Sequence, residues 1–308
     1  MNEAIIVSEI QPAPKRSFLA RIFISPDEPR LRAGWRLLIQ TLLMIVISLP
    51  ISLFANLIKV GSNELLQSQI VELIIFVSSI YLARRFLDKR SFVSLGLQIN
   101  KQALADIFIG IAITFVMMGL IYFAEVGAGW LTFKNFAWQA ESTTNVIFGV
   151  LTFFVVFIFV GWNEELLSRG YHLQTLASGT NMFWGVVISS SVFGLAHLGN
   201  PNATWISAAG IFFAGVFLAY GYLRTGQLWL SIGLHIGWNF FEGVIFGFPV
   251  SGLDIYRLIH HQVQGPVLWT GGAFGPEAGL IVLPALVIGA ALIYFCTRSR
   301  KTVQETGK

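Results

Sequence analysis

Long apolar runs separated by short polar segments dominate the chain. A helix that crosses a bilayer needs about 20 mostly apolar residues. The pattern predicts eight transmembrane helices, at residues 37–58, 65–83, 107–124, 142–163, 181–198, 203–223, 227–248 and 278–296. The turn-forming residues of HLGNPNAT (197–204) divide the fifth helix from the sixth, within a stretch that contains no Asp, Glu, Lys or Arg.

The composition agrees with a membrane protein. Hydrophobic residues make up 55% of the chain and charged residues 12%, whereas soluble domains carry about 25% charged residues. The fold class is therefore predicted to be an all-α polytopic membrane protein with the lipid bilayer as its partner. A net charge of +4 gives no indication of nucleic acid as a partner. The single cysteine, Cys296, excludes an intrachain disulfide.

The basic residues predict the orientation of the helices, because Lys and Arg are enriched in cytoplasmic loops. If the N-terminus is inside, the predicted outer segments hold three of the 20 basic residues, namely Lys59, Lys134 and Arg257. Both termini are therefore expected in the cytoplasm. The predicted organisation has cytoplasmic tails at 1–34 (with no cleavable signal peptide) and 298–308, helices one to three at 35–126, a core of helices four to seven at 142–248, an external loop at 249–276 and helix eight at 277–297.

Four polar residues lie where lipid-facing helices are apolar: Glu164, His197, His235 and Asn239. Ionisable groups inside a membrane cost free energy, so they are usually paired or functional. Singly, each has a structural explanation, since His and Asn form hydrogen bonds between helices and a glutamate can mark a helix end. Together they suggest a site.

Spacing assigns different tasks to two adjacent glutamates. Glu165 and Arg169 are four residues apart, with the acid first, which favours an ion pair along one helix face. Glu164 lies about 100° around the helix from Glu165, so it is expected to remain free. His235 and Asn239 are also four apart and share a face.

This set of residues allows three kinds of chemistry. An unpaired glutamate can act as general base on water, a histidine can orient that water, and His and Asn can donate to an oxyanion. Two histidines and a glutamate can also bind zinc, although HExxH is absent. A proton-coupled transporter would use the same groups as a proton relay.

Three motifs in order resemble the CPBP family of intramembrane proteases, which contains the type II CAAX prenyl endopeptidases and bacteriocin-processing or immunity proteins. They are EExxxR at 164–169, FxxxH at 193–197 and HxxxN at 235–239. The resemblance implies a catalytic role for Glu164, water activation by His197, oxyanion stabilisation by His235 and Asn239, and support from Glu165 and Arg169. The family has been described both as metalloproteases and as glutamate proteases. The cofactor therefore stays open between none and zinc, which Glu164, His197 and His235 would hold.

The sequence thus predicts an intramembrane endopeptidase of the cell (plasma or inner) membrane. Its expected substrate is a membrane-associated peptide or protein, CAAX-like or other, and its cavity is expected to face the cytoplasm. An inactive scaffold or bacteriocin-immunity protein of the same fold, or a proton-coupled transporter, are the alternatives. One difficulty is depth: His197 and His235 would differ by roughly 12 Å along their helices, unless the helix that carries His197 begins earlier, near Thr175.

Overall fold

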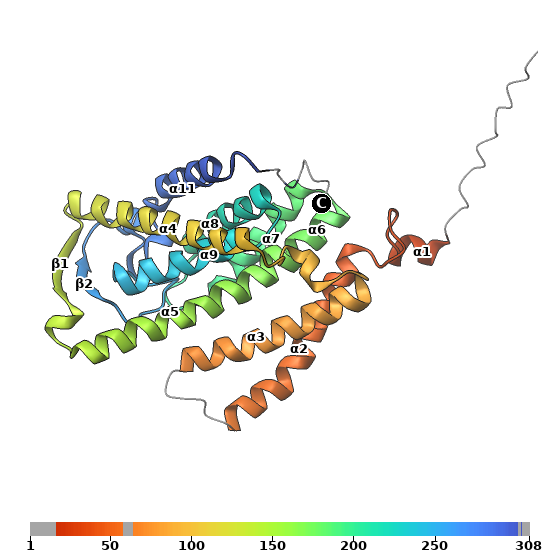
Figure 1. The fold of residues 1–308 in the computed structure, drawn as a ribbon, viewed down its shortest axis with the longest axis horizontal. Coiled ribbons are helices and arrows are strands. Elements are labelled where there is room, and N and C mark those ends of the chain that lie inside the picture. The colour runs from red at the N-terminus through yellow and green to blue at the C-terminus, as the bar shows by residue number, and fades with distance from the viewer. Residues whose placement is uncertain (1–16, 58–63, 301–302, 304–308) are drawn as a thin grey trace, which may run out of the picture.

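The computed structural model describes residues 17–57, 64–300 and 303, and within these residues the chain is mostly helical. Figure 1 shows long helices lying side by side in one bundle. The helices are α1 (Phe18–Phe23), α2 (Ala33–Leu57), α3 (Glu64–Leu82), α4 (Lys101–Gly127), α5 (Thr143–Glu165), α6 (Gln174–Gly179), α7 (Met182–Ala196), α8 (Trp205–Thr225), α9 (Trp229–Asn239), α10 (Val267–Thr270) and α11 (Val282–Thr297).

Capping residues set where four of these helices begin. The side chains of Asn100, Ser142, Asn181 and Thr204 accept hydrogen bonds from backbone N–H groups in the first turns of α4, α5, α7 and α8. Each cap satisfies a donor that would otherwise lack a partner at the helix end. Asn181 places the start of α7 at Met182, close to the predicted start at residue 181, and the alternative start near Thr175 is not observed. Residues 174–179 instead form α6, at the end of a helical run that extends from residue 143 to 179.

Helix α9 lies at the centre of the bundle and packs against α4, α5 and α8. Every residue from Leu230 to Asn239 is buried. Glycines bring α9 and α4 into backbone contact, because a Cβ at Gly110 would collide with the Gly233–Leu234 backbone and a Cβ at Gly233 with that of Ile107. The close approach requires residues without a side chain at these positions.

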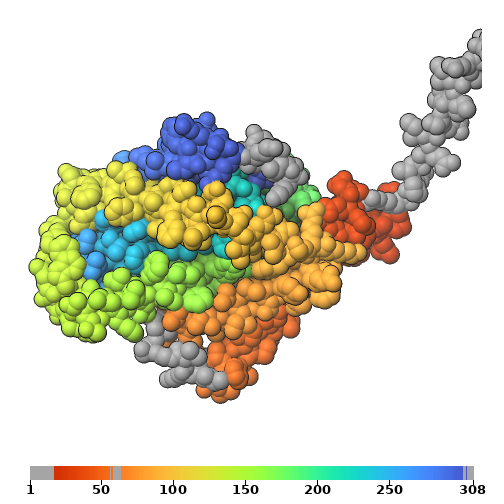
Figure 2. Space-filling view, viewed as in Figure 1, coloured from red at the N-terminus to blue at the C-terminus, as the bar shows by residue number. Residues whose placement is uncertain are grey.

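The outside of the bundle is apolar. Helix α2 exposes Leu42, Ile45 and Leu49, and α5 exposes Phe148 and Leu151. Figure 2 shows one face of this surface, to which α3, α4 and α5 contribute. Exposed apolar area on this scale is expected of a surface that contacts lipid rather than water.

Within the part of the chain that the structure describes, six helical segments are long and apolar enough to cross a membrane: Ala33–Ala55, Glu64–Leu87, Lys101–Gly127, Thr143–Gly179, Met182–Gly199 and Trp205–Thr225. They correspond to the first six predicted helices. The other two are shorter, since α9 has 11 residues and α11 has 16. The count of eight crossings and the positions of the termini therefore remain predictions, and residues 1–16 and most of the final tail lie outside the described residues.

A small sheet modifies the all-α prediction. Strands β1 (Leu131–Phe136) and β2 (Ile259–Val263) pair antiparallel, with Leu131 opposite Val263. The predicted loop 249–276 therefore contains a strand, and this strand pairs with the segment between α4 and α5. His261 of β2 packs against Phe248, with ring centroids 4.8 Å apart.

Buried ion pairs connect helix ends at one end of the bundle. Arg36 of α2, Arg84 at the end of the α3 run, and Arg30 all contact Asp88. Arg300, beyond α11, lies 2.5 Å from Asp106 of α4. The start of α2 is therefore close to the end of the α3 run, and the start of α4 is close to the end of α11.

Candidate active site

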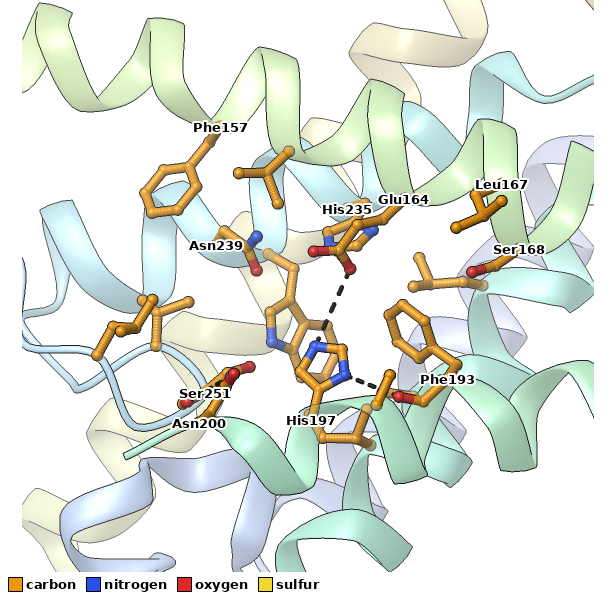
Figure 3. Close-up of a pocket in the computed structure, with 18 of the residues that line it drawn as sticks. Phe157, Glu164, Leu167, Ser168, Phe193, His197, Asn200, His235, Asn239 and Ser251 are labelled. Atoms are coloured by element: carbon orange, nitrogen blue, oxygen red, sulfur yellow. Dashed lines mark hydrogen bonds and ion pairs between the residues drawn. The ribbon is translucent and has the colours of Figure 1, made fainter. Parts of the chain in front are cut away.

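A cavity of about 420 Å³ lies between α3, α5, α7, α8, α9 and the segment 249–278. Figure 3 shows Glu164, His197, His235 and Asn239 gathered around it. The four polar residues come from three helical segments far apart in the sequence, and the fold brings all four to one cavity. Its ionisable lining residues are Glu72, Glu164, His172, His197, His235 and Glu277.

Glu165 and Arg169 form a buried ion pair beside the cavity. Arg169 Nη1 lies 2.7 Å from Glu165 Oε1, as the i,i+4 spacing predicts, and the two side chains are 1% and 0% exposed. Arg169 also donates through Nη2 to the carbonyl of Gly215 in α8, at 3.0 Å. Its guanidinium carbon lies 4.3 Å from the ring centroid of Phe193 in α7. Arg169 therefore connects three helices.

The structure adds a second contact for Glu165, which sequence spacing did not suggest. The same Oε1 atom accepts a hydrogen bond from His235 Nδ1 at 2.8 Å. This bond requires a proton on Nδ1, because a carboxylate can only accept. It fixes the orientation of the ring, so that Nε2 faces Glu164 Oε2 at 3.7 Å. Glu165 thus positions His235 as well as pairing with Arg169.

His197, directly after the end of α7, also faces Glu164. Its Nδ1 donates to the carbonyl of Phe193 at 2.8 Å, which leaves Nε2 to face Glu164 Oε2 at 4.0 Å. Neither histidine is within direct hydrogen-bond distance of Glu164. A water about 2.8 Å from both Glu164 Oε2 and His197 Nε2 would see them at an angle of roughly 90°, near the angle between its own two O–H bonds.

Asn239 lies one helical turn after His235 and is 6% exposed. Its amide lines the cavity, and Figure 3 shows it next to the carboxylate of Glu164. Because i and i+4 share a helix face, His235 and Asn239 present two polar groups to the same part of the cavity.

Both motif helices change to π-helical geometry directly after the site residues. The segment Leu166–Leu173 follows Glu165, and Phe240–Ile245 follows Asn239. Such wider turns occur frequently at functional sites. In the first of them, Ser168 and His172 line the cavity below Glu164.

The separations in the site do not match a zinc centre. Zinc ligands lie about 2.0–2.1 Å from a tetrahedral ion, which places two ligand atoms roughly 3.3 Å apart. The Nε2–Oε2 separations of 3.7 and 4.0 Å are longer. Among the described residues, no three His, Cys, Asp or Glu side chains are close enough to hold a metal ion.

Sequence reasoning missed two parts of the cavity wall. Glu72 of α3 is one, since the only feature that distinguishes it in the sequence is a single charge within an apolar run. Glu277 is the other, and its carboxylate accepts from the Ser251 N–H at 2.8 Å, the Ser251 hydroxyl at 2.6 Å and Trp238 Nε1 at 2.9 Å. No motif indicates Glu277, because the contacts depend on the fold of segment 249–278.

Comparison with known proteins identifies one family. The family described as "Type II CAAX prenyl endopeptidase Rce1-like" matches residues 145–241, which carry all three motifs. A Bacillus subtilis (strain 168) protein described as "Putative membrane peptidase YdiL" is 30% identical over 174 residues, which cover 54% of this chain and 67% of the relative. An Escherichia coli protein described as "Uncharacterized 24.3 kDa protein" is 33% identical over 89 residues, which cover 28% of this chain and 40% of the relative.

Proposed function

Because the chain belongs to the CPBP family, which includes the Rce1-like type II CAAX prenyl endopeptidases, we propose that it is an intramembrane endopeptidase. It hydrolyses a peptide bond of a membrane-associated peptide or protein. The observation that carries the proposal is the position of Glu164, whose Oε2 faces Nε2 of His197 and Nε2 of His235 at 4.0 and 3.7 Å. In this arrangement one water can donate to Glu164 Oε2, the base, and to His197 Nε2, a second acceptor.

Glu164 is the general base in the proposed reaction. It takes a proton from the water, whose second hydrogen is held by His197 Nε2. The resulting hydroxide attacks the carbonyl carbon of the scissile peptide bond. When the C–N bond breaks, Glu164 returns the proton to the departing amine nitrogen. The base and acid roles thus belong to one carboxyl group, and atoms and charge balance over the cycle.

His235 and Asn239 stabilise the oxyanion that forms on the carbonyl oxygen. Asn239 donates through its amide N–H. His235 donates through Nε2 when its ring carries both protons, and the carboxylate of Glu165 on Nδ1 stabilises that charged ring. Donors that are already in place before the reaction make the largest contribution to this kind of catalysis. Arg169 acts indirectly, by holding Glu165.

The proposed setting is the cell membrane, with both chain ends and the cavity on the cytoplasmic side. The distribution of the 20 Lys and Arg residues supports this orientation.

The test is to compare the wild type with Glu164→Gln. Each is expressed in cells, and peptides released from membrane proteins are identified by mass spectrometry. The proposal expects a set of peptides that the wild type releases and Glu164→Gln does not, while Glu141→Gln, a change at a loop glutamate outside the cavity, behaves like the wild type. If no released peptide depends on Glu164, the chain is a scaffold of this fold rather than a protease.

A further inference from the structure

Helix α3, which packs against α5, contributes to the cavity wall a carboxylate that the reaction does not use. We propose that Glu72 of α3 is a specificity-determining residue, which binds the ammonium or guanidinium group of a Lys or Arg close to the scissile bond. The inference rests on the proposed function, because it assigns the substrate class of that site. Glu72 lies outside residues 145–241, which match the family.

The charge of the cavity is one-sided. Three glutamates, Glu72, Glu164 and Glu277, line it, and among its described lining residues there is no Lys or Arg. Elsewhere in the described part of the chain, Asp88, Asp106 and Glu165 each have an arginine within 4.0 Å. A cavity with three carboxylates and no Lys or Arg among its described lining residues favours a cationic ligand over an anionic one.

Glu72 is held in place by a chain of buried amides. Gln69 Nε2 donates to Glu72 Oε2 at 3.0 Å. Asn163 Nδ2 in turn donates to the backbone carbonyl of Gln69 at 2.9 Å and to Gln69 Oε1 at 3.2 Å. Asn163 directly precedes Glu164. The buried amides of Gln69 in α3 and Asn163 in α5 therefore fix the position of Glu72 relative to the proposed base, Glu164.

Glu277 is a weaker candidate for the same task. Its side chain already accepts three hydrogen bonds, from Ser251 and Trp238, and only 4% of the residue is exposed. Gln69 is the one described side chain that donates to Glu72, and no described Lys, Arg or His lies within the 4.0 Å limit of an ion pair with it. Glu72 therefore retains acceptor capacity for a ligand.

A Lys or Arg side chain fits this position chemically. Its apolar stem can lie along Phe76 and Leu65, which line the same cavity, while the charged end reaches Glu72. An approaching cation also stabilises the ionised form of the carboxylate. A charge-assisted hydrogen bond of this kind corresponds to about a tenfold preference over an uncharged side chain of equal length.

The experiment uses the purified full-length protein in detergent micelles and a positional set of internally quenched peptides on one apolar host sequence. At each position in turn the residue is Lys, norleucine or Glu, where norleucine has the length of Lys without its charge. Cleavage sites are mapped by mass spectrometry. Wild type, Glu72→Gln, Glu164→Gln and Glu64→Gln are compared. Glu64 is an exposed residue of the same helix and serves as the matched control.

At one position near the cleavage site, the wild type should cleave the Lys peptide about tenfold faster, in kcat/KM, than the norleucine peptide. Glu72→Gln should remove that preference, mainly through KM, and leave the norleucine peptide and the melting temperature unchanged. Glu64→Gln should retain it. If Glu72→Gln slows all peptides equally, Glu72 supports the structure or the proton transfer, and the inference is overturned.

Two other outcomes distinguish this inference from the proposed function. Cleavage that requires Glu164 but shows no preference for Lys at any position overturns the role of Glu72 and leaves the protease assignment standing. If no peptide is cleaved in a way that requires Glu164, both the role of Glu72 and the protease assignment are overturned.

Discussion

Replacing each of the two adjacent glutamates with glutamine should have different effects on turnover and on stability. Glu164→Gln removes the proton acceptor but keeps the size of the side chain. Glu165→Gln removes the charge that pairs with Arg169 at 2.7 Å and orients His235 at 2.8 Å. The first change therefore affects the chemistry, whereas the second affects both the stability and the chemistry.

The burial of the pair sets the magnitude. Glu165 and Arg169 are 0% and 1% exposed, and removal of one partner of a buried pair costs about 3–5 kcal/mol. The remaining contacts of Arg169, with Gly215 and Phe193, favour the lower end. For a protein of this size, ~3 kcal/mol corresponds to a fall in melting temperature of about 5 °C. Loss of the His235 anchor should lower kcat a further ~10-fold.

The assay is a melting temperature at one fixed heating rate in one detergent, together with cleavage of a reference peptide. Glu164→Gln should lower turnover by at least about 100-fold with little change in melting temperature. Glu165→Gln should lower both. Arg169→Ala should resemble Glu165→Gln, and the double variant should be less than additive, since both changes disrupt one interaction. Equal loss of stability at both glutamates, or full turnover by Glu164→Gln, would refute the assignment.

Three further predictions concern the rest of the chain. Reporter fusions should place Lys134 outside the cell and Lys308 in the cytoplasm, and a Lys308 fusion that reports outside excludes eight crossings. Prolonged dialysis against a chelator should leave peptide cleavage unchanged, because the Nε2–Oε2 separations exceed those of zinc ligands; loss of activity that zinc restores would contradict this geometry. Burial, together with the nearby charge of Arg257, lowers the pKa of His261 to about 4, so the unfolded chain binds more protons between about pH 6.5 and 4. The free energy of unfolding should therefore have its full value above about pH 6.5 and decrease as the pH falls toward 4. The variant His261→Phe should remove most of this pH dependence, whereas His260→Phe should retain it.

Much of the bundle could be predicted, because a membrane helix is recognised from the apolar composition of its own stretch of sequence. Apolar length identified the first six helices, and i,i+4 spacing identified the Glu165–Arg169 pair. The predicted seventh helix shows the limit of this signal. Helix α9 contacts protein on all sides, so its length is set by α4, α5 and α8 rather than by the thickness of a bilayer.

Contacts between distant segments could not be predicted in this way. The bond between Glu165 and His235 joins residues 70 positions apart, and no spacing rule describes it. The expected difference in depth between His197 and His235 was wrong, since Nε2 of each ring lies within 4.0 Å of Glu164 Oε2. How far one helix is displaced along another depends on their packing, which residue spacing within a helix does not describe. Glu277 lines the cavity because it belongs to the irregular segment 249–278, whose path depends on tertiary contacts.

The glycine contacts between α4 and α9 also constrain how the protein can move. Gly110 and Gly233 place the two backbones against each other, and a sliding motion would bring Cβ atoms of neighbouring residues into the positions that only glycine can occupy. Helices α4 and α9 should therefore behave as one rigid body, in which His235 and Asn239 keep fixed coordinates during turnover. The displacement that admits a peptide into the cavity must then occur in its other walls, which are α3, α5, α7, α8 and the segment 249–278.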